Sequence, residues 1–157
     1  MGGTILGKGN TQFNIEFNFA ADPEALLRVF KDFKMINLIP WEASPEFVIP
    51  LEDYEELQNP AHPKAKFLAG VHADQMKRLR KIMICDGFTP IVAIDSTVCD
   101  SIEELQAKVY TQGDAAGQIS YAWPKYTSHY NKKKVNCRVY HDFDIKKTMK
   151  ILLKSLK

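Results

Sequence analysis

The chain has 157 residues, of which 45% are hydrophobic and 25% charged, and its net charge is +2. That length fits one domain with a core of its own, and that composition excludes a wholly disordered protein. We therefore predict a single domain over residues 1–157. No stretch approaches the ~18 apolar residues that a membrane-spanning helix needs, so we expect no membrane partner.

Three cysteines, Cys85, Cys99 and Cys137, are odd in number and widely spaced, and they form no CxxC pair. This spacing disfavours a disulfide framework or a zinc site and favours a reducing compartment. Cys99 precedes an expected helix, but Asp100 beside it opposes a thiolate, so we interpret it as a partly buried, unreactive thiol. We expect a cytoplasmic protein without a cofactor.

The first elements are predicted from local patterns. Residues 1–10 are glycine-rich and approach a phosphate-binding loop, but Gly9 stands where that loop needs a hydroxyl, so we predict a flexible segment. Residues 12–19 alternate polar and apolar side chains, which predicts a strand. Asp22, Pro23 and Glu24 then match the start of a helix that runs to about Lys34.

The middle of the chain is less regular. Residues 40–63 carry five of the eight prolines, which predicts a long surface excursion with a short strand at 47–49 and a helical turn at 52–57. A helix is expected over residues 73–84. The apolar run at 88–95 predicts a central strand.

Ser101 and Glu104 match a capping box, which predicts a helix to about Tyr110. Strands are expected at 118–123 and 135–141. A basic amphipathic helix capped by Asp144 is predicted at the C-terminus, over residues 144–157. The order of these elements indicates an α+β or α/β fold, with a mixed sheet packed against about four helices.

The charge is unevenly distributed, with −6 over residues 1–106 and +8 over residues 107–157. Lysines can neutralise phosphates, and tyrosine rings can stack on unpaired bases. The chain is therefore predicted to be a small, non-catalytic binding protein whose partner is nucleic acid or an acidic protein. The predicted contact residues are Lys125, Tyr126, Tyr130, Lys132, Lys133, Lys134, Arg138, Lys146, Lys147 and Lys150.

Two other functions are left open, besides the plain alternative that a lysine-rich face is only solvated. The first is a self-assembling subunit of a virus particle or filament, a homo-oligomer joined by head-to-tail contacts between acidic and basic regions. The second is a metal-dependent phosphohydrolase or nuclease that uses Asp95, Asp142 and Asp144 as ligands. For Asp144, capping of the last helix explains the residue without a metal.

Overall fold

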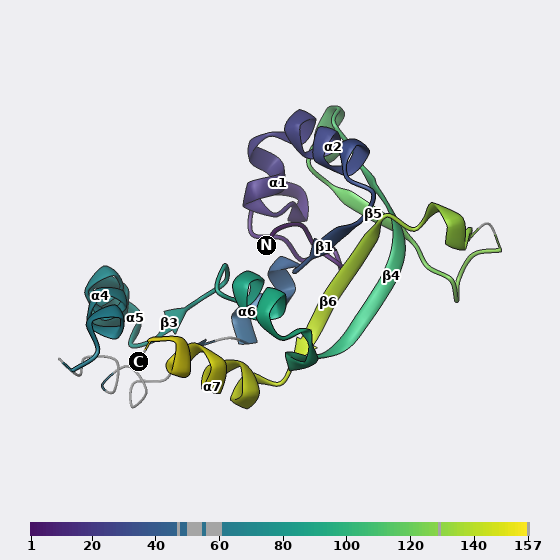
Figure 1. The fold of residues 1–157 in the computed structure, drawn as a ribbon. Helices are drawn as coiled ribbons and strands as arrows, with labels where there is room; N and C mark the ends of the chain where they lie inside the picture. The colour runs from purple at the N-terminus through teal and green to yellow at the C-terminus, as the bar shows by residue number, and fades with distance from the viewer. Residues whose placement is uncertain (47, 50–54, 56–60, 129, 157) are drawn as a thin grey trace. The chain divides into compact units, whose positions relative to one another are not determined.

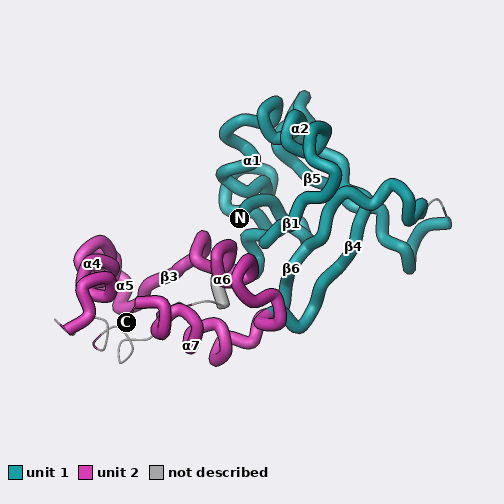
Figure 2. The backbone as a smooth tube through the Cα atoms, in the orientation of Figure 1, with its two compact units in different colours: residues 1–43, 99–142 teal, residues 44–98, 143–157 magenta. Residues whose placement is uncertain are grey.

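The computed structural model describes residues 1–46, 48–49, 55, 61–128 and 130–156 (Figure 1). The described chain divides into two compact units, residues 1–43 with 99–142 and residues 44–98 with 143–157 (Figure 2). The single domain over residues 1–157 stays a prediction. The helical turn expected at 52–57 lies, apart from Glu55, outside the described residues.

Unit 1 contains a four-stranded sheet in the order β1-β6-β4-β5 (Figure 1). Its strands are β1 (Ile36–Leu38), β4 (Cys99–Val109), β5 (Ile119–Ala122) and β6 (Cys137–Phe143). β1 runs parallel to β6, whereas β4 and β5 are antiparallel. This mixture confirms the predicted class, a mixed α/β fold with a mixed sheet.

The core of unit 1 lies between this sheet and the helices α1 (Phe17–Ala21) and α2 (Pro23–Asp32). Leu105 and Val139 are fully buried on the sheet, and the rings of Phe19 and Phe30 meet edge to face above it. α2 begins as predicted, since the Asp22 carboxylate accepts the Ala25 amide at 2.8 Å. The local cap and the burial of apolar side chains therefore both favour a helix in this part of the chain.

Unit 2 is mainly helical. It contains α4 (Pro63–Val71), α5 (Ala73–Leu79), α6 (Phe88–Ile94) and α7 (Ile145–Leu156), with a short antiparallel pair of β2 (Val48–Ile49) and β3 (Ile82–Met83). Ile49, Ile82 and Phe88 are fully buried, and the Phe88 ring packs against Phe143. The described residues thus form six α-helices, against about four predicted. None of these helices is long and apolar enough to cross a membrane.

The strand predicted over residues 12–19 is wrong. A 3₁₀ turn (η1, Gln12–Asn14) and α1 occupy this segment, so the four apolar residues do not share one face. Ile15 and Phe19 are buried, whereas Phe13 and Phe17 are 61% and 62% exposed. The Glu16 side chain caps α1, and that cap overrides the alternating pattern.

Two further predictions are wrong, because a helix forms where we predicted a strand and a strand forms where we predicted a helix. The apolar run at 88–95 forms helix α6, whose residues Phe88 and Ile91 are buried one turn apart. Residues 101–110 belong to strand β4 rather than to a helix, and Leu105, Ala107 and Val109 are buried at every second position. Pairing with β5 decides this segment, because a capping-box pattern cannot outweigh a sheet ladder and its buried face.

We predict that Leu105→Ala lowers the free energy of unfolding by about 2–5 kcal/mol, because it leaves a cavity in the core of unit 1. The change is measured by urea unfolding followed through the fluorescence of Trp123, which packs against this core. Ile102→Ala on the same strand is the control, because Ile102 is exposed and its truncation should change stability by less than about 0.5 kcal/mol. Equal effects of the two variants would contradict the core assignment.

Candidate functional site

A buried carboxylate organises the N-terminal segment of unit 1. Glu16 is only 2% exposed, and its two oxygens accept the backbone amides of Gly3 at 2.9 Å, Asn18 at 2.8 Å and Phe19 at 3.2 Å. A buried carboxylate without such donors would be strongly destabilising, so three amides compensate its desolvation. Glu16 therefore fixes Gly3 against the first turn of α1.

A second carboxylate, Glu42, gathers the residues that follow Gly3. Its oxygens accept the amides of Ile5, Leu6 and Lys8 at 2.9 to 3.2 Å. Converging backbone amides of this kind form an anion-binding concavity. In this chain the anion is the protein's own side chain, so the glycine-rich segment is anchored rather than flexible.

The same segment lies at the carboxyl end of β1. The Gly2 amide donates to the Ile39 carbonyl at 3.0 Å, and the Trp41 amide donates to the Gly3 carbonyl at 2.9 Å. In open α/β sheets, ligands bind beyond the carboxyl ends of parallel strands. The start of α1, held to Gly3 by Glu16, is therefore placed where such sheets bind ligands.

Three side chains are exposed at this place: Asn10, Phe17 and Asn18, which we call the α1 surface. The Asn10 carboxamide oxygen accepts the Phe17 amide at 2.8 Å, which ties the preceding loop to the helix. The Asn18 carboxamide nitrogen lies 3.5 Å from the Met1 carbonyl. The α1 surface thus offers two carboxamides and one aromatic ring to a polar, ring-bearing ligand.

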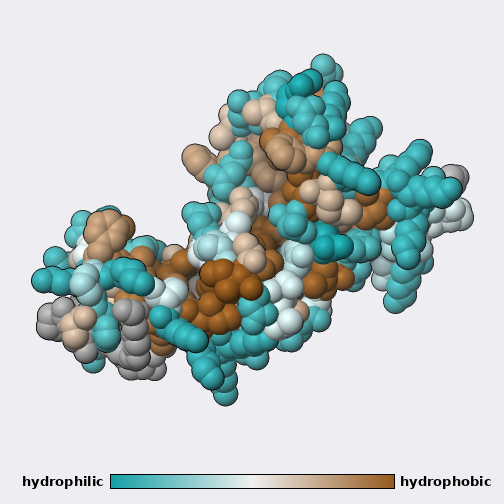
Figure 3. Space-filling model, viewed as in Figure 1, coloured by the Kyte–Doolittle hydropathy of each residue, from teal (hydrophilic) through white to brown (hydrophobic). Residues whose placement is uncertain are grey.

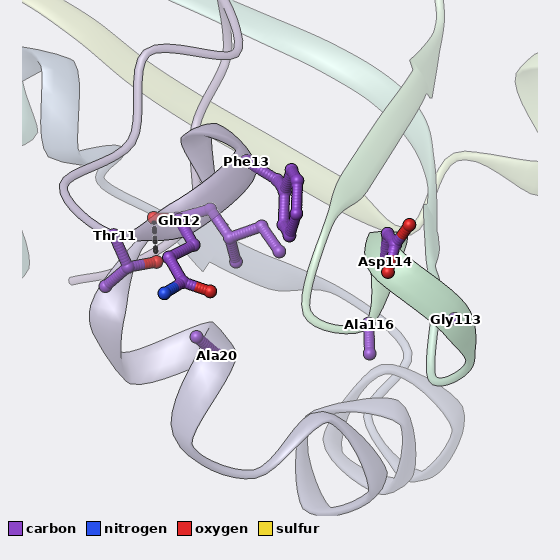
Figure 4. Close-up of a pocket in the computed structure, with 8 residues that line it drawn as sticks. Thr11, Gln12, Phe13, Ala20, Gly113, Asp114 and Ala116 are labelled. Carbon is purple, nitrogen blue, oxygen red and sulfur yellow. Dashed lines mark hydrogen bonds between the residues drawn. The ribbon is translucent and has the colours of Figure 1, made fainter.

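A pocket of about 360 Å³ lies nearby, between η1, α1 and the 3₁₀ turn η4 (Gly113–Ala115) (Figure 4). The Phe13 side chain stands on one side of it and Asp114 on the other, with Ala20 and Ala116 between the two turns. Gln118 holds the turns together by donating to the Phe13 carbonyl at 3.2 Å. This volume is within the range of small-molecule sites.

Two residues that begin the α1 region have unusual backbone angles. Phe13 and Asn14 both have positive φ, at 55° and 60°. A positive φ is strained for a bulky residue such as Phe and is maintained only where the surroundings impose it. Here it turns the chain so that the Phe13 ring remains in solvent while Ile15 enters the core.

The sequence-predicted contact residues are divided between the two units, and their joint role stays a prediction. Lys125, Tyr126, Tyr130, Arg138 and the 3₁₀ turn of Lys132–Lys134 belong to unit 1, whereas Lys146, Lys147 and Lys150 belong to α7 in unit 2. Arg138 binds the Glu104 carboxylate at 2.6 Å, and this hydrogen bond raises the pKa of the guanidinium. The Tyr130 hydroxyl donates to the Glu104 carbonyl at 3.1 Å.

The three aspartates considered as metal ligands serve separate local roles. Thr97 donates to Asp95 from its amide and hydroxyl, and these bonds, with Lys147 at 3.6 Å, lower the pKa of the Asp95 carboxyl. Asp142 pairs with His141 at 3.1 Å, and Asp144 caps α7 through the Lys147 amide at 2.9 Å. Within the described ranges, no group of three or more His, Cys, Asp or Glu residues could hold a metal ion.

Asn10, Glu16, Phe17 and Asn18 were not selected by the sequence reasoning. The alternating pattern assigned Glu16 and Asn18 to the solvent side of a strand, which hid the burial of Glu16. The partner that requires this burial, Gly3, lies 13 residues away in the sequence. One signal was available, since an acid three residues before Phe19 has the spacing of a helix cap.

Comparison with known proteins gives the family context. Residues 1–150 match the family model described as inosine-uridine preferring nucleoside hydrolase. No curated protein matches the chain. Three solved structures share the fold: an inosine-guanosine nucleoside hydrolase (24% identity, TM-score 0.85), an inosine-uridine preferring nucleoside hydrolase from Bacillus anthracis (19%, 0.78) and a purine-preferring ribonucleoside hydrolase from Gardnerella vaginalis (17%, 0.76). Each comparison covers 99% of this chain but only 49–50% of the other, so the chain spans about half the length of these proteins.

These matches correct the predicted function and partners. The prediction of a non-catalytic protein that binds nucleic acid or an acidic protein is wrong, because the matched family consists of nucleoside hydrolases. The assembly subunit of a virus or filament and the phosphohydrolase or nuclease are wrong for the same reason. Charge clustering misled the prediction, since Arg138 and Lys147 have acidic partners within the chain.

We predict that Glu16→Gln lowers the free energy of unfolding by about 1–3 kcal/mol, because one carbonyl oxygen cannot accept three buried amides and the new amide group opposes them. Urea unfolding measures the change. Glu24→Gln, at an exposed position in the first turn of α2, is the control and should change stability by less than about 0.5 kcal/mol. A Glu16→Gln variant as stable as the control would show that the carboxylate does not hold the segment.

The three free thiols should differ in reactivity. Burial raises the pKa of the Cys137 thiol to about 12, and burial likewise raises the pKa of Cys99, so both stay protonated at pH 8. The thiolate is the reactive form, and we therefore expect dithionitrobenzoate to modify the half-exposed Cys85 first. All three thiols should react at once in 6 M urea. Fast modification of Cys137 in the folded chain would contradict its burial.

Proposed function

The chain belongs to the inosine-uridine preferring nucleoside hydrolase family, and on that premise we propose that it takes part in hydrolysing the N-glycosidic bond of a ribonucleoside. In this reaction the bond from C1′ of the ribose to the base nitrogen breaks, water supplies the new hydroxyl at C1′, and the base leaves with a proton. The chain spans about half the length of the solved relatives. We therefore assign to it one part of the substrate site rather than the whole reaction.

The observation that carries this proposal is the composition and place of the α1 surface. A ribose presents hydroxyl groups that both donate and accept hydrogen bonds, and the carboxamides of Asn10 and Asn18 can do the same. A nucleoside base has a flat aromatic face, which the exposed ring of Phe17 can contact. The carboxyl end of β1 beside this surface supports the assignment, because ligands bind there in open α/β sheets.

The role proposed for these side chains is binding and orientation. Hydrolysis of a glycosidic bond develops positive charge on the sugar ring, and holding the ring in one place lowers the entropic barrier to attack by water. Glu16 does not fit the role of a proton donor or acceptor, since three amides already engage its oxygens in a buried position. We assign it the role of a positioning residue for Asn18.

The pocket between η1 and η4 is the second candidate for the substrate, favoured by its volume and by the Phe13 ring. It lies against the connection between the antiparallel strands β4 and β5, not at the end of the parallel pair. The position of the α1 surface relative to β1 leads us to prefer that surface. The α1 surface contains the carboxamide of Asn18 and the pocket contains that of Gln12. Substituting each residue in turn therefore distinguishes which of the two sites binds the substrate.

We expect inosine to receive magnetisation from the chain in saturation-transfer NMR, at both its ribose and its base protons. Asn18→Ala should raise the Kd about tenfold, which corresponds to one lost hydrogen bond of about 1.4 kcal/mol. Gln12→Ala in the pocket and Gln112→Ala, another exposed carboxamide, are matched controls that should leave the Kd unchanged. Loss of binding in Gln12→Ala alone would show that inosine binds in the pocket. The absence of any magnetisation transfer to inosine would contradict the proposal.

A cytoplasmic location is proposed with this function. Cys85, Cys99 and Cys137 are all free thiols. Free thiols persist where glutathione and thioredoxin keep the medium reducing, as in the cytosol. The proposal rests on this thiol chemistry alone.

A further inference from the structure

The pocket between η1 and η4 is enclosed by two turns that the fold holds against each other (Figure 4). Gln118, three residues after η4, donates from its carboxamide to the Phe13 carbonyl at 3.2 Å. Gly117 has a φ of +93°, and a Cβ atom there would lie 2.7 Å from the Phe19 carbonyl oxygen. Only glycine therefore allows the chain after η4 to approach α1 so closely. The walls of the pocket are fixed by contacts within unit 1 and need no ligand to form.

One wall presents an aromatic ring that the fold keeps out of the core. Phe13 is 61% exposed, and its φ of 55° is strained for a bulky residue. Ile15 enters the core of unit 1, whereas the Phe13 side chain stands at the pocket (Figure 4). Figure 3 shows apolar surface over the part of unit 1 that contains α1 and α2. A ring exposed beside a pocket offers a flat face to a planar ligand.

The other wall presents a carboxylate. Asp114 is exposed in η4, and none of the ion pairs or hydrogen bonds formed by described residues involves its side chain. The described residues that line the pocket include no Lys, Arg or His, so its charge comes from Asp114. An ionised carboxylate only accepts hydrogen bonds. The pocket therefore favours a ligand that is neutral or positive and that carries N–H donors.

We propose that this pocket is a second ligand site, which binds a flat conjugated group carrying two adjacent N–H donors. The flat face of such a group stacks against the Phe13 ring, and its paired donors bind both oxygens of Asp114. This bidentate geometry is among the strongest that a carboxylate forms. The Gln12 carboxamide, which also lines the pocket, can bind a further polar atom of the ligand.

Two kinds of small molecule carry this edge. Guanine has a ring N–H beside its exocyclic amino group and is neutral. Amidinium and guanidinium groups carry the same pair of donors as cations, and they also gain attraction from the face of an aromatic ring. The shared chemistry is the paired donor edge, and the charge of the ligand distinguishes the two sources.

The proposed site is independent of the α1 surface. Hypoxanthine, the base of inosine, has the ring N–H of guanine but lacks its amino group, so it can give Asp114 only one hydrogen bond. Inosine is therefore expected at the α1 surface and not in the pocket. None of the residues assigned to the α1 surface lines the pocket, so either proposal can fail without the other.

Two matched pairs of probes test the donor edge. Isocytosine presents a ring N–H beside an amino group, as guanine does, and pyrimidinone lacks only the amino group. Benzamidine carries the paired donors as a cation, and benzamide has an oxygen in place of one nitrogen. In NMR titrations we expect isocytosine or benzamidine to shift the backbone amide signals of Phe13 and of residues 113–116. Its Kd should be at least about tenfold lower than that of its matched compound.

The outcomes separate the sources and can overturn the proposal. Tighter binding of isocytosine would assign the site to a guanine-type base, and tighter binding of benzamidine would assign it to a small cation. The proposal is overturned if neither probe binds, if both matched compounds bind as tightly as the probes, or if the shifted signals lie outside residues 11–20 and 113–118.

Two pairs of variants test the walls. Asp114→Asn keeps the shape but replaces one acceptor oxygen by a donor, and it should weaken probe binding at least about tenfold. Asp100→Asn, at an exposed position of β4, is its control. Phe13→Leu removes the flat ring and should weaken binding about threefold to tenfold. Phe33→Leu, at a position that is 62% exposed, is the matched control. Both controls should bind the probes as the unmodified chain does.

Circular dichroism checks that each variant folds. Equal affinity of Asp114→Asn and Asp100→Asn for the probe would overturn the proposal. If a pocket variant does not fold, the matched probes decide, because they are measured on the unmodified chain. Probe binding without inosine binding would support the pocket and count against the proposed function, and inosine binding without probe binding would show the reverse.

Discussion

The Glu16 carboxylate joins the N-terminal segment to the start of α1. It accepts amides from Gly3, Asn18 and Phe19, and Gly3 in turn is bonded to the backbone just beyond β1. A buried charge is tolerated only when its hydrogen bonds are complete, so this arrangement fixes all its partners at once. The start of α1, the loop before it and the end of the parallel strand are consequently held as one unit.

Glu42 fixes the next stretch of backbone in the same way, by accepting its amides. Together the two carboxylates hold six amide donors between Gly3 and Phe19, and they convert a glycine-rich segment into a defined loop. Such a loop would otherwise offer its amides to a phosphate. Because internal carboxylates occupy these amides, the segment instead supports the neighbouring α1 surface.

The distribution of charge along the sequence is a poor guide to this protein. The basic C-terminal third contains Arg138 and Lys147, and both have acidic partners, Glu104 and Asp95, from the acidic part of the chain. Exposed ion pairs of this kind contribute little to stability, but they reduce the potential available to a polyanion. The functional assignment comes instead from the family match and from uncharged groups, the carboxamides and rings of the α1 surface.

The sequence by itself determined the elements whose signals are local. Asp22 with Pro23 predicted the start of α2 and Asp144 predicted the start of α7. The strand-like segments at 118–123 and 135–141 predicted β5 and β6. Tertiary structure decided residues 12–19, 88–95 and 101–110, because short apolar or alternating runs fit either helix or strand until packing against the rest of the chain selects one. It also decided the candidate site, since the burial of Glu16 depends on an amide 13 residues away. The place of the α1 surface depends on β1, in which Ile36 pairs with Cys137 of β6, 101 residues later. Contacts at such separations leave no periodic signal in the sequence, and only the folded chain reveals them.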